Sequence, residues 1–203
     1  MTGGMNVVFD IGNVLIGWDP RVLYRKIFAS EDEVAWFLGH VCTPEWNLEQ
    51  DRGRSFRDAI AEATQRYPQH ADAIAAYDRR WAETILGPIT GTVAILDELE
   101  AQGTPLYAIT NWHQDKFRET RGRFSFLERF RDIVVSGDER LVKPDPAIYR
   151  LLLERNGLAA GSCLFIDDSP RNVAGAEAVG MRAHHFTSPE ALRGHLTAAG
   201  ILP

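Results

Sequence analysis

An apolar run near the start of the chain, residues 6–16, carries one carboxylate, Asp10, toward a turn that contains glycine. Continuous apolar runs are typical of strands that are buried on both faces of a parallel sheet. We predict that this run is the first and central strand of such a sheet. Ligands of open α/β sheets bind beyond the carboxyl ends of the strands. Asp10 is therefore a candidate functional residue, although a carboxylate in this position can also simply cap a turn.

Three later apolar segments repeat this pattern of a strand that is followed by polar side chains. They are 105–109 with Thr110 and Asn111, 133–136 with Lys143, and 163–166 with Asp167 and Asp168. The carboxyl ends of parallel strands meet at one edge of a sheet. We therefore expect an acid, a hydroxyl with an amide, a lysine and a pair of acids to converge there.

Between about residues 19 and 85 the apolar residues recur at helical spacing, and we predict no strand in this part of the chain. Ser55 is expected to cap one of these helices, and Gly87 with Pro88 is expected to form a hinge. The polar segment 45–53 is predicted to be irregular. These features indicate an all-helical insertion.

From residue 90 onward, helical and strand periods alternate. Strands that are separated by helices of this length predict an α/β fold with a Rossmann-like, doubly wound parallel sheet. We divide the chain into a core of residues 1–17 and 88–203 and a helical insertion of residues 18–87. Residues 1–4 are expected to form a loosely structured N-terminal lead segment.

The amino-acid composition limits the kinds of molecule that this protein could bind. The chain has 203 residues, of which 45% are hydrophobic, and its formal net charge is −6. This acidity argues against nucleic acids and anionic membranes as partners, because both usually require a basic face. Its two cysteines, Cys42 and Cys163, are not expected to form a disulfide, which fits a cytoplasmic location. No run of about 18 apolar residues indicates a membrane span.

The polar residues at the strand ends suggest phosphoryl transfer. A carboxylate such as Asp10 can attack phosphorus and form an aspartyl phosphate. Asp10, Asp167 and Asp168 offer hard oxygen ligands for Mg²⁺, and the charge of Lys143 could hold the transferring oxygens. Each residue also has an ordinary alternative, because Asp168 could cap a helix and Lys143 could simply be solvated.

In this order, the four groups resemble the motifs of the haloacid dehalogenase superfamily. The resemblance covers residues 10 to about 172 and is greatest for the phosphatase branch with a helical cap. That branch includes bacterial sugar-phosphate phosphatases, such as glucose-1-phosphatases, and the N-terminal domain of soluble epoxide hydrolases. The resemblance implies that Asp10 is the nucleophile, that the Gly12 carbonyl is a further Mg²⁺ ligand, and that residues 18–87 form the cap.

The chain departs from that family at Gly12, where phosphatases usually carry a second Asp that acts as general acid and base. Asp19 and His113 are candidate substitutes, although either could instead cap a helix. The departure leaves two alternatives open. One is a 2-haloacid dehalogenase, which also lacks the second Asp, and the other is a binding or regulatory relative with weak catalysis.

We expect the substrate to be a small phosphorylated metabolite, with sugar phosphates among the candidates. Thr110 and Asn111 could bind its phosphate, while Trp46 and Trp112 could line the pocket for the rest of the molecule. Packing between cap and core is the ordinary alternative for both tryptophans. Neither the oligomeric state nor the particular ester follows from the residues.

Overall fold

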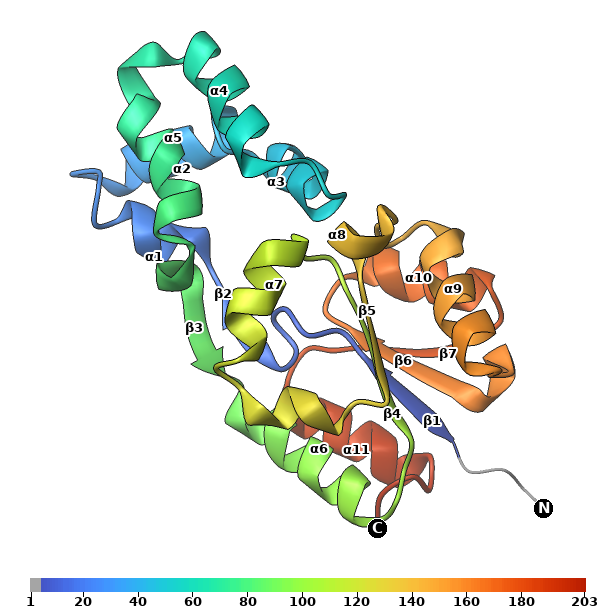
Figure 1. Cartoon of the computed structure of the whole chain (residues 1–203). Helices are drawn as coiled ribbons and strands as arrows, with labels where there is room; N and C mark the ends of the chain where they lie inside the picture. Colours follow the sequence, from blue (N-terminus) through green and yellow to red (C-terminus); the bar gives the residue numbers. More distant parts are fainter. Residues whose placement is uncertain (1–4) are drawn as a thin grey trace.

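The computed structural model describes residues 5–203, so the lead expected at residues 1–4 lies outside the described part. A parallel sheet of five strands, in the order β5-β4-β1-β6-β7, forms its centre (Figure 1). The strands are β1 (Asn6–Phe9), β4 (Leu106–Thr110), β5 (Asp132–Val135), β6 (Cys163–Asp167) and β7 (Arg182–His185). The predicted doubly wound sheet, with the first strand at its centre, is confirmed.

Side chains along each strand alternate between two hydrophobic clusters because successive residues of a strand point to opposite faces. Val7 and Phe9 belong to one cluster and Val8 to the other. Helices α6 (Thr90–Ala101) and α11 (Pro189–Ala198) contribute leucines to the first cluster. Helices α9 (Pro146–Asn156) and α10 (Pro170–Ala178) contribute buried residues to the second. Burial on both faces explains why the inner strands β1, β4 and β6 are mostly apolar, whereas the edge strand β7 is polar and partly exposed.

Shorter elements complete the core. They are α7 (Gln114–Arg121), η3 (Ser125–Arg129), α8 (Ser136–Glu139) and η4 (Ala160–Ser162). None of the helices described between residues 5 and 203 is both long and apolar enough to cross a membrane.

The predicted strand at residues 6–16 is wrong in its extent, because β1 ends at Phe9 and β2 (Ile16–Trp18) belongs to a separate antiparallel pair. The loop between them contains Asn13 in the left-handed conformation, with φ of 55°. Asparagine tolerates that conformation better than most residues, and its Oδ1 accepts the Trp18 N–H at 2.9 Å. The first strand therefore ends directly before Asp10, which lies in the segment that leads into this turn.

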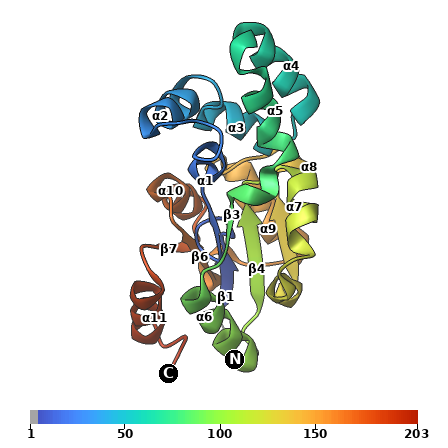
Figure 2. The same ribbon diagram turned by 90° about the vertical axis from the view of Figure 1, so that its left-hand side faces the viewer.

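The partner of β2 is β3 (Ile85–Pro88), so Gly87 and Pro88 form part of a strand rather than a free linker. All helices between these two strands lie together at the end of the molecule to which β4 points (Figure 2). They are α1 (Pro20–Tyr24), α2 (Glu31–His40), α3 (Pro44–Asp51), α4 (Phe56–Arg66), η1 (Pro68–His70), α5 (Ala71–Arg79) and η2 (Trp81–Thr84). The predicted helical character of this part is confirmed, as is the Ser55 N-cap.

The prediction of irregular structure at residues 45–53 is wrong, because most of this segment forms α3. Pro44 occupies its first turn, and Thr43 Oγ1 accepts the Trp46 N–H at 3.1 Å. Threonine at the N-cap followed by proline is a favourable helix start. Although the segment is polar, Gln50 and Asp51 at its end are buried. Tertiary packing therefore outweighs the weak apolar pattern.

Candidate active site

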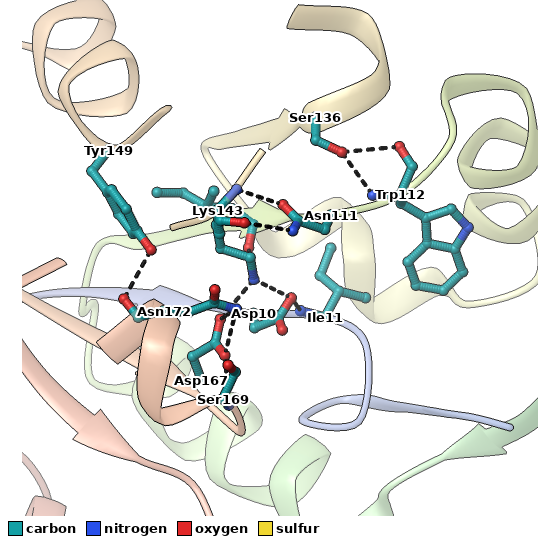
Figure 3. Close-up of polar contacts among 11 residues, drawn as sticks. Asp10, Ile11, Asn111, Trp112, Ser136, Lys143, Tyr149, Asp167, Ser169 and Asn172 are labelled. Atoms are coloured by element: carbon teal, nitrogen blue, oxygen red, sulfur yellow. Dashed lines mark hydrogen bonds and ion pairs between the residues drawn. The ribbon is translucent and has the colours of Figure 1, made fainter. Parts of the chain in front are cut away.

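The ammonium group of Lys143 lies at the centre of a buried polar cluster (Figure 3). Its Nζ is 2.8 Å from Asp10 Oδ1 and 2.7 Å from Asp167 Oδ2. It also donates to the Ile109 carbonyl at 3.0 Å. The loops after β1, β4 and β6 and the segment after β5 thus meet at the carboxyl edge of the sheet, as the sequence predicts.

Burial and charge act in opposite directions on the two central groups. Burial raises the pKa of Asp10 to about 7, a rise that the charge of Lys143 opposes and the charge of Asp167 reinforces. Burial alone would lower the pKa of Lys143, but the charges of Asp10 and Asp167 outweigh it and raise that pKa. Lys143 is therefore a permanent cation that favours the ionised form of its neighbours.

Asp167 accepts hydrogen bonds from several further donors. Its Oδ1 accepts the Ser169 N–H at 2.8 Å and the Asn172 side-chain amide at 3.0 Å. The Tyr149 hydroxyl in turn donates to the Asn172 carbonyl at 2.8 Å. These contacts fix the carboxylate in one orientation, directed toward Lys143.

Asp10, Asp167 and Asp168 together could hold a metal ion, because one oxygen of each lies within 4.8 Å of the others. Asp168 is exposed, and its pKa is raised by partial burial and by the charge of Asp167. The ammonium group of Lys143 contacts two of these three carboxylates, so their ionised forms carry excess negative charge. Hard oxygen donors with such an excess fit Mg²⁺. Gly12 lies two residues beyond Asp10, on the same loop.

Asn111 binds the backbone of Lys143 through both ends of its side-chain amide. Its Oδ1 accepts the Lys143 N–H at 2.8 Å, and its Nδ2 donates to the Lys143 carbonyl at 3.1 Å. Thr110 is fully buried, and its hydroxyl has no hydrogen-bond partner among residues 5–203. A buried unpaired hydroxyl is unfavourable, so this group is available to an incoming polar atom.

Trp112 lies beside a small cavity of about 70 Å³ at the boundary between the core and the helical segment. The cavity is lined by Gly12, Trp18, Asn47, Asp51, Trp81, Asn111 and Trp112. Ser136 connects the core to the helical segment. Its Oγ accepts the Trp112 N–H at 2.9 Å and donates to the Asp51 carbonyl at 2.6 Å.

Trp46 is not among the residues that line this cavity. Its ring packs edge-on against Tyr77, with centroids 5.1 Å apart, and also contacts Phe56. It borders a different hollow of about 320 Å³, on the side of the helical segment that carries Glu49 and Arg54. The structure therefore brings Trp112, but not Trp46, to the cavity beside Gly12.

Asp19 and His113, the candidate substitutes for the missing second acid, both cap helices. Asp19 Oδ1 accepts the Arg21 N–H at 2.8 Å, and His113 Nδ1 accepts the Asp115 N–H at 3.2 Å. Neither residue lines the cavity beside Gly12. Burial also lowers the pKa of His113, which favours its neutral form.

Sequence reasoning gave no role to Asp51, although the structure buries its carboxyl in this cavity wall. The only signal was the polar character of residues 45–53. Without the helix that this segment forms, nothing distinguished Asp51 from its exposed neighbours.

The polar edge of the sheet can be compared with known proteins. The sequence model of the haloacid dehalogenase-like hydrolases matches residues 24–185. The chain belongs to this family. A related protein, the sesquiterpene phosphatase astK of Aspergillus oryzae, is 28% identical over 89% of this chain and 88% of its own length. This haloacid dehalogenase-like hydrolase is therefore an enzyme whose relatives include phosphatases.

Solved structures agree with the family fold. A magnesium complex of a family enzyme from Bacteroides thetaiotaomicron has a TM-score of 0.71 and is 18% identical, covering 92% of this chain and 95% of its own. The L-2-haloacid dehalogenase of Xanthobacter autotrophicus has a TM-score of 0.63 at 20% identity, covering 98% of this chain and 85% of its own. At such identities the likeness concerns the fold alone, so the chemistry must be argued from the site.

Proposed function

We propose that this family member is a Mg²⁺-dependent phosphomonoester hydrolase that forms an aspartyl phosphate on Asp10. The observation that carries the proposal is a cluster of three carboxylates, two of which contact one buried ammonium group. Attack on a carbon–halogen bond needs no metal ion, so that reaction gives the second and third acids no cation to hold. They are useful when a divalent cation must be held beside a phosphate.

In this proposal Asp10 attacks the phosphorus atom through a carboxylate oxygen, and the bond to the leaving oxygen breaks. Lys143 holds Asp10 in place, and its charge offsets part of the negative charge that gathers on the phosphoryl oxygens. The hydroxyl of Thr110 is available to one of these oxygens, and Asn111 keeps the Lys143 backbone in position. Asp10, Asp167, Asp168 and the Gly12 carbonyl would hold Mg²⁺. When bound, this ion supplies positive charge that lets two anions approach each other.

We further propose that residues 18–87 act as a cap over this site and that residues 1–17 and 88–203 form the catalytic core. The contact of Ser136 with the Asp51 carbonyl supports this view, because it joins residues 18–87 to the residues that directly follow β5. A closed cap would exclude water during attack.

The substrate is proposed to be a small phosphorylated metabolite. The cavity of about 70 Å³ admits only a few heavy atoms, but Trp18 and Asn47 also border a neighbouring hollow of about 380 Å³. Sugar phosphates are candidates, and Trp112 would contact the leaving group. Because Cys42 and Cys163 are both free, we propose that the enzyme works in a reducing compartment such as the cytoplasm.

Phosphate release from a panel of small phosphomonoesters, with and without Mg²⁺, tests the proposal. We expect metal-dependent release that Asp10→Asn abolishes. Chloride release from 2-haloacids without phosphate release would show a dehalogenase instead. Binding of an ester without release of either product would show a binding relative.

A further inference from the structure

Gly12 leaves this enzyme without an acid at the position where related phosphatases usually carry one. The space beside it is open, since no atom outside its chain neighbours lies within 4 Å of where a Cβ would stand. A phosphomonoester with a poor leaving group still needs a proton donor within hydrogen-bond reach of the departing oxygen. That donor must come from another part of the chain.

Asp51, the last residue of α3, is buried in the wall of the cavity that Gly12 and Asn111 also line. Among the described residues that line this cavity, Asp51 is the only one with a carboxyl side chain. Asp51 therefore lines this cavity from the side of the cap, whereas Gly12 lines it from the side of the core.

Two contacts hold Asp51 directly, and a third acts on it through Asn47. Its Oδ2 accepts the Asn47 side-chain amide at 3.0 Å, and Asn47 Oδ1 accepts the Tyr77 hydroxyl at 2.8 Å. Its backbone carbonyl accepts the Ser136 hydroxyl at 2.6 Å. Contacts from α3, α5 and α8 thus hold the residue, as a proton-transfer group at a fixed site requires.

The surroundings of Asp51 suit proton exchange near neutral pH. Burial raises its pKa from 3.8 to about 7, while the backbone N–H of His113 and the charge of Lys143 oppose the rise. The other polar groups that face it, the Asn47 amide and the hydroxyls of Tyr77 and Ser136, are uncharged. General acids and bases are most effective when their pKa lies near the working pH.

We propose that Asp51 is the general acid and base of the reaction, supplied by the cap in place of the carboxylate that is absent at Gly12. The inference rests on the proposed phosphatase function and names the residue that this function otherwise lacks.

The proton balance has two steps. As the Asp10 oxygen bonds to phosphorus and the ester bond breaks, the leaving oxygen takes the proton of the Asp51 carboxyl and departs as an alcohol. The Asp51 carboxylate then takes a proton from water while the water oxygen attacks phosphorus. Cleavage of the bond between phosphorus and Asp10 releases phosphate, restores the Asp10 carboxylate and leaves Asp51 protonated.

The test compares Asp51→Asn with the wild type on two esters, with Mg²⁺ present. An alkyl phosphate needs a proton on its leaving oxygen, whereas p-nitrophenyl phosphate releases a stable anion. We expect Asp51→Asn to slow phosphorylation by the alkyl ester roughly 10²- to 10⁴-fold. The first burst of nitrophenol should remain, and the aspartyl phosphate should then accumulate and be visible by intact mass spectrometry.

Two variants sharpen the test. Asp78→Asn changes another cap acid, which pairs with Lys116 away from the cavity, and should leave both rates unchanged. Adding Gly12→Asp to Asp51→Asn should restore the alkyl ester rate by about tenfold or more, because the space beside Gly12 is open. Asparagine keeps the shape of Asp51 and an acceptor for Asn47, so the fold should survive, which thermal melting checks.

The results separate the inference from the proposed function. Equal losses on both esters without accumulation of the phosphoenzyme would show that Asp51 only positions other groups, and would overturn its assignment. A double variant no faster than Asp51→Asn would also count against it. A wild type that releases phosphate from neither ester would overturn the proposed function, and the role of Asp51 with it.

Discussion

Asn111 holds Lys143 by its backbone, accepting the N–H at 2.8 Å and donating to the carbonyl at 3.1 Å. The two residues are 32 positions apart in the chain, yet this pair sets where the central cation stands. The position of the ammonium group therefore depends on an amide that does not touch it.

Replacement of Asn111 by alanine should move Lys143 and leave two backbone polar groups without a partner. We expect a loss of about 1–3 kcal/mol in the free energy of unfolding and a fall of roughly tenfold or more in kcat. Chemical denaturation and steady-state kinetics measure the two effects. Asn111→Asp retains the acceptor but not the donor, and should be intermediate in stability. A variant with wild-type kcat would show that the pair is not needed to position the cation.

Under the proposed function, removal of one of the carboxylate oxygens that would hold the metal should weaken Mg²⁺ binding. At a concentration 100 times its dissociation constant, a ligand that binds only the folded state stabilises it by about 2.7 kcal/mol. We expect Mg²⁺ to raise the melting temperature of the wild type and to have much less effect on Asp168→Asn. Asp138→Asn, an exposed acid that pairs with Arg118, is the matched control. Equal Mg²⁺ stabilisation of all three proteins would place the metal elsewhere.

The raised pKa of Asp51 has a consequence for stability. Between its unfolded value of 3.8 and its folded value of about 7, the folded protein binds more protons than the unfolded chain. Stability therefore falls as pH rises through this window. Relative to Asp51→Asn, the metal-free wild type should lose on the order of 3 kcal/mol between about pH 4 and about pH 8. Urea unfolding at several pH values measures this difference, and parallel curves for the two proteins would contradict it.

Gly175 allows α10 to approach the segment that carries Lys143. A Cβ there would stand 2.8 Å from the Pro144 carbonyl oxygen and 3.0 Å from the Tyr149 hydroxyl. We expect Gly175→Ala to destabilise the protein by about 1–3 kcal/mol. Gly194→Ala lies in α11 with open space around it and should instead be neutral or stabilising by up to about 1 kcal/mol. Thermal melts of the two variants that shift in the same direction would contradict the steric argument.

The inner strands β1, β4 and β6 could be predicted because they are largely buried on both faces, so their apolar runs stand out from the helices around them. The meeting of Asp10, Lys143 and Asp167 followed from topology, since parallel strands end at a common edge. The apolar runs are visible in the local sequence, and the rule that parallel strands end at a common edge holds for such folds in general. A single sequence is therefore enough to predict these features.

The remaining features depend on contacts between distant segments. The apolar run at residues 6–16 is interrupted by a turn at Asn13, and only its last residue, Ile16, joins the strand that pairs with β3, about seventy residues later in the chain. The burial of Asp51 requires both the formation of α3 and its contact with Ser136. Neither the strand pairing nor the Ser136 contact follows from the local sequence. The part of the site that residues 18–87 contribute could therefore not be predicted.

The pairing of β2 with β3 has a mechanical consequence. The chain leaves the core and returns to it through two strands that lie side by side, with Ile16 opposite Pro88 and Trp18 opposite Ile85. Two adjacent, paired crossings act as one ribbon, which bends far more easily across its flat face than within its plane. The helices between β2 and β3 would then move mainly in one direction. Each time the proposed cap closed over the site, Asp51 would return to the same position.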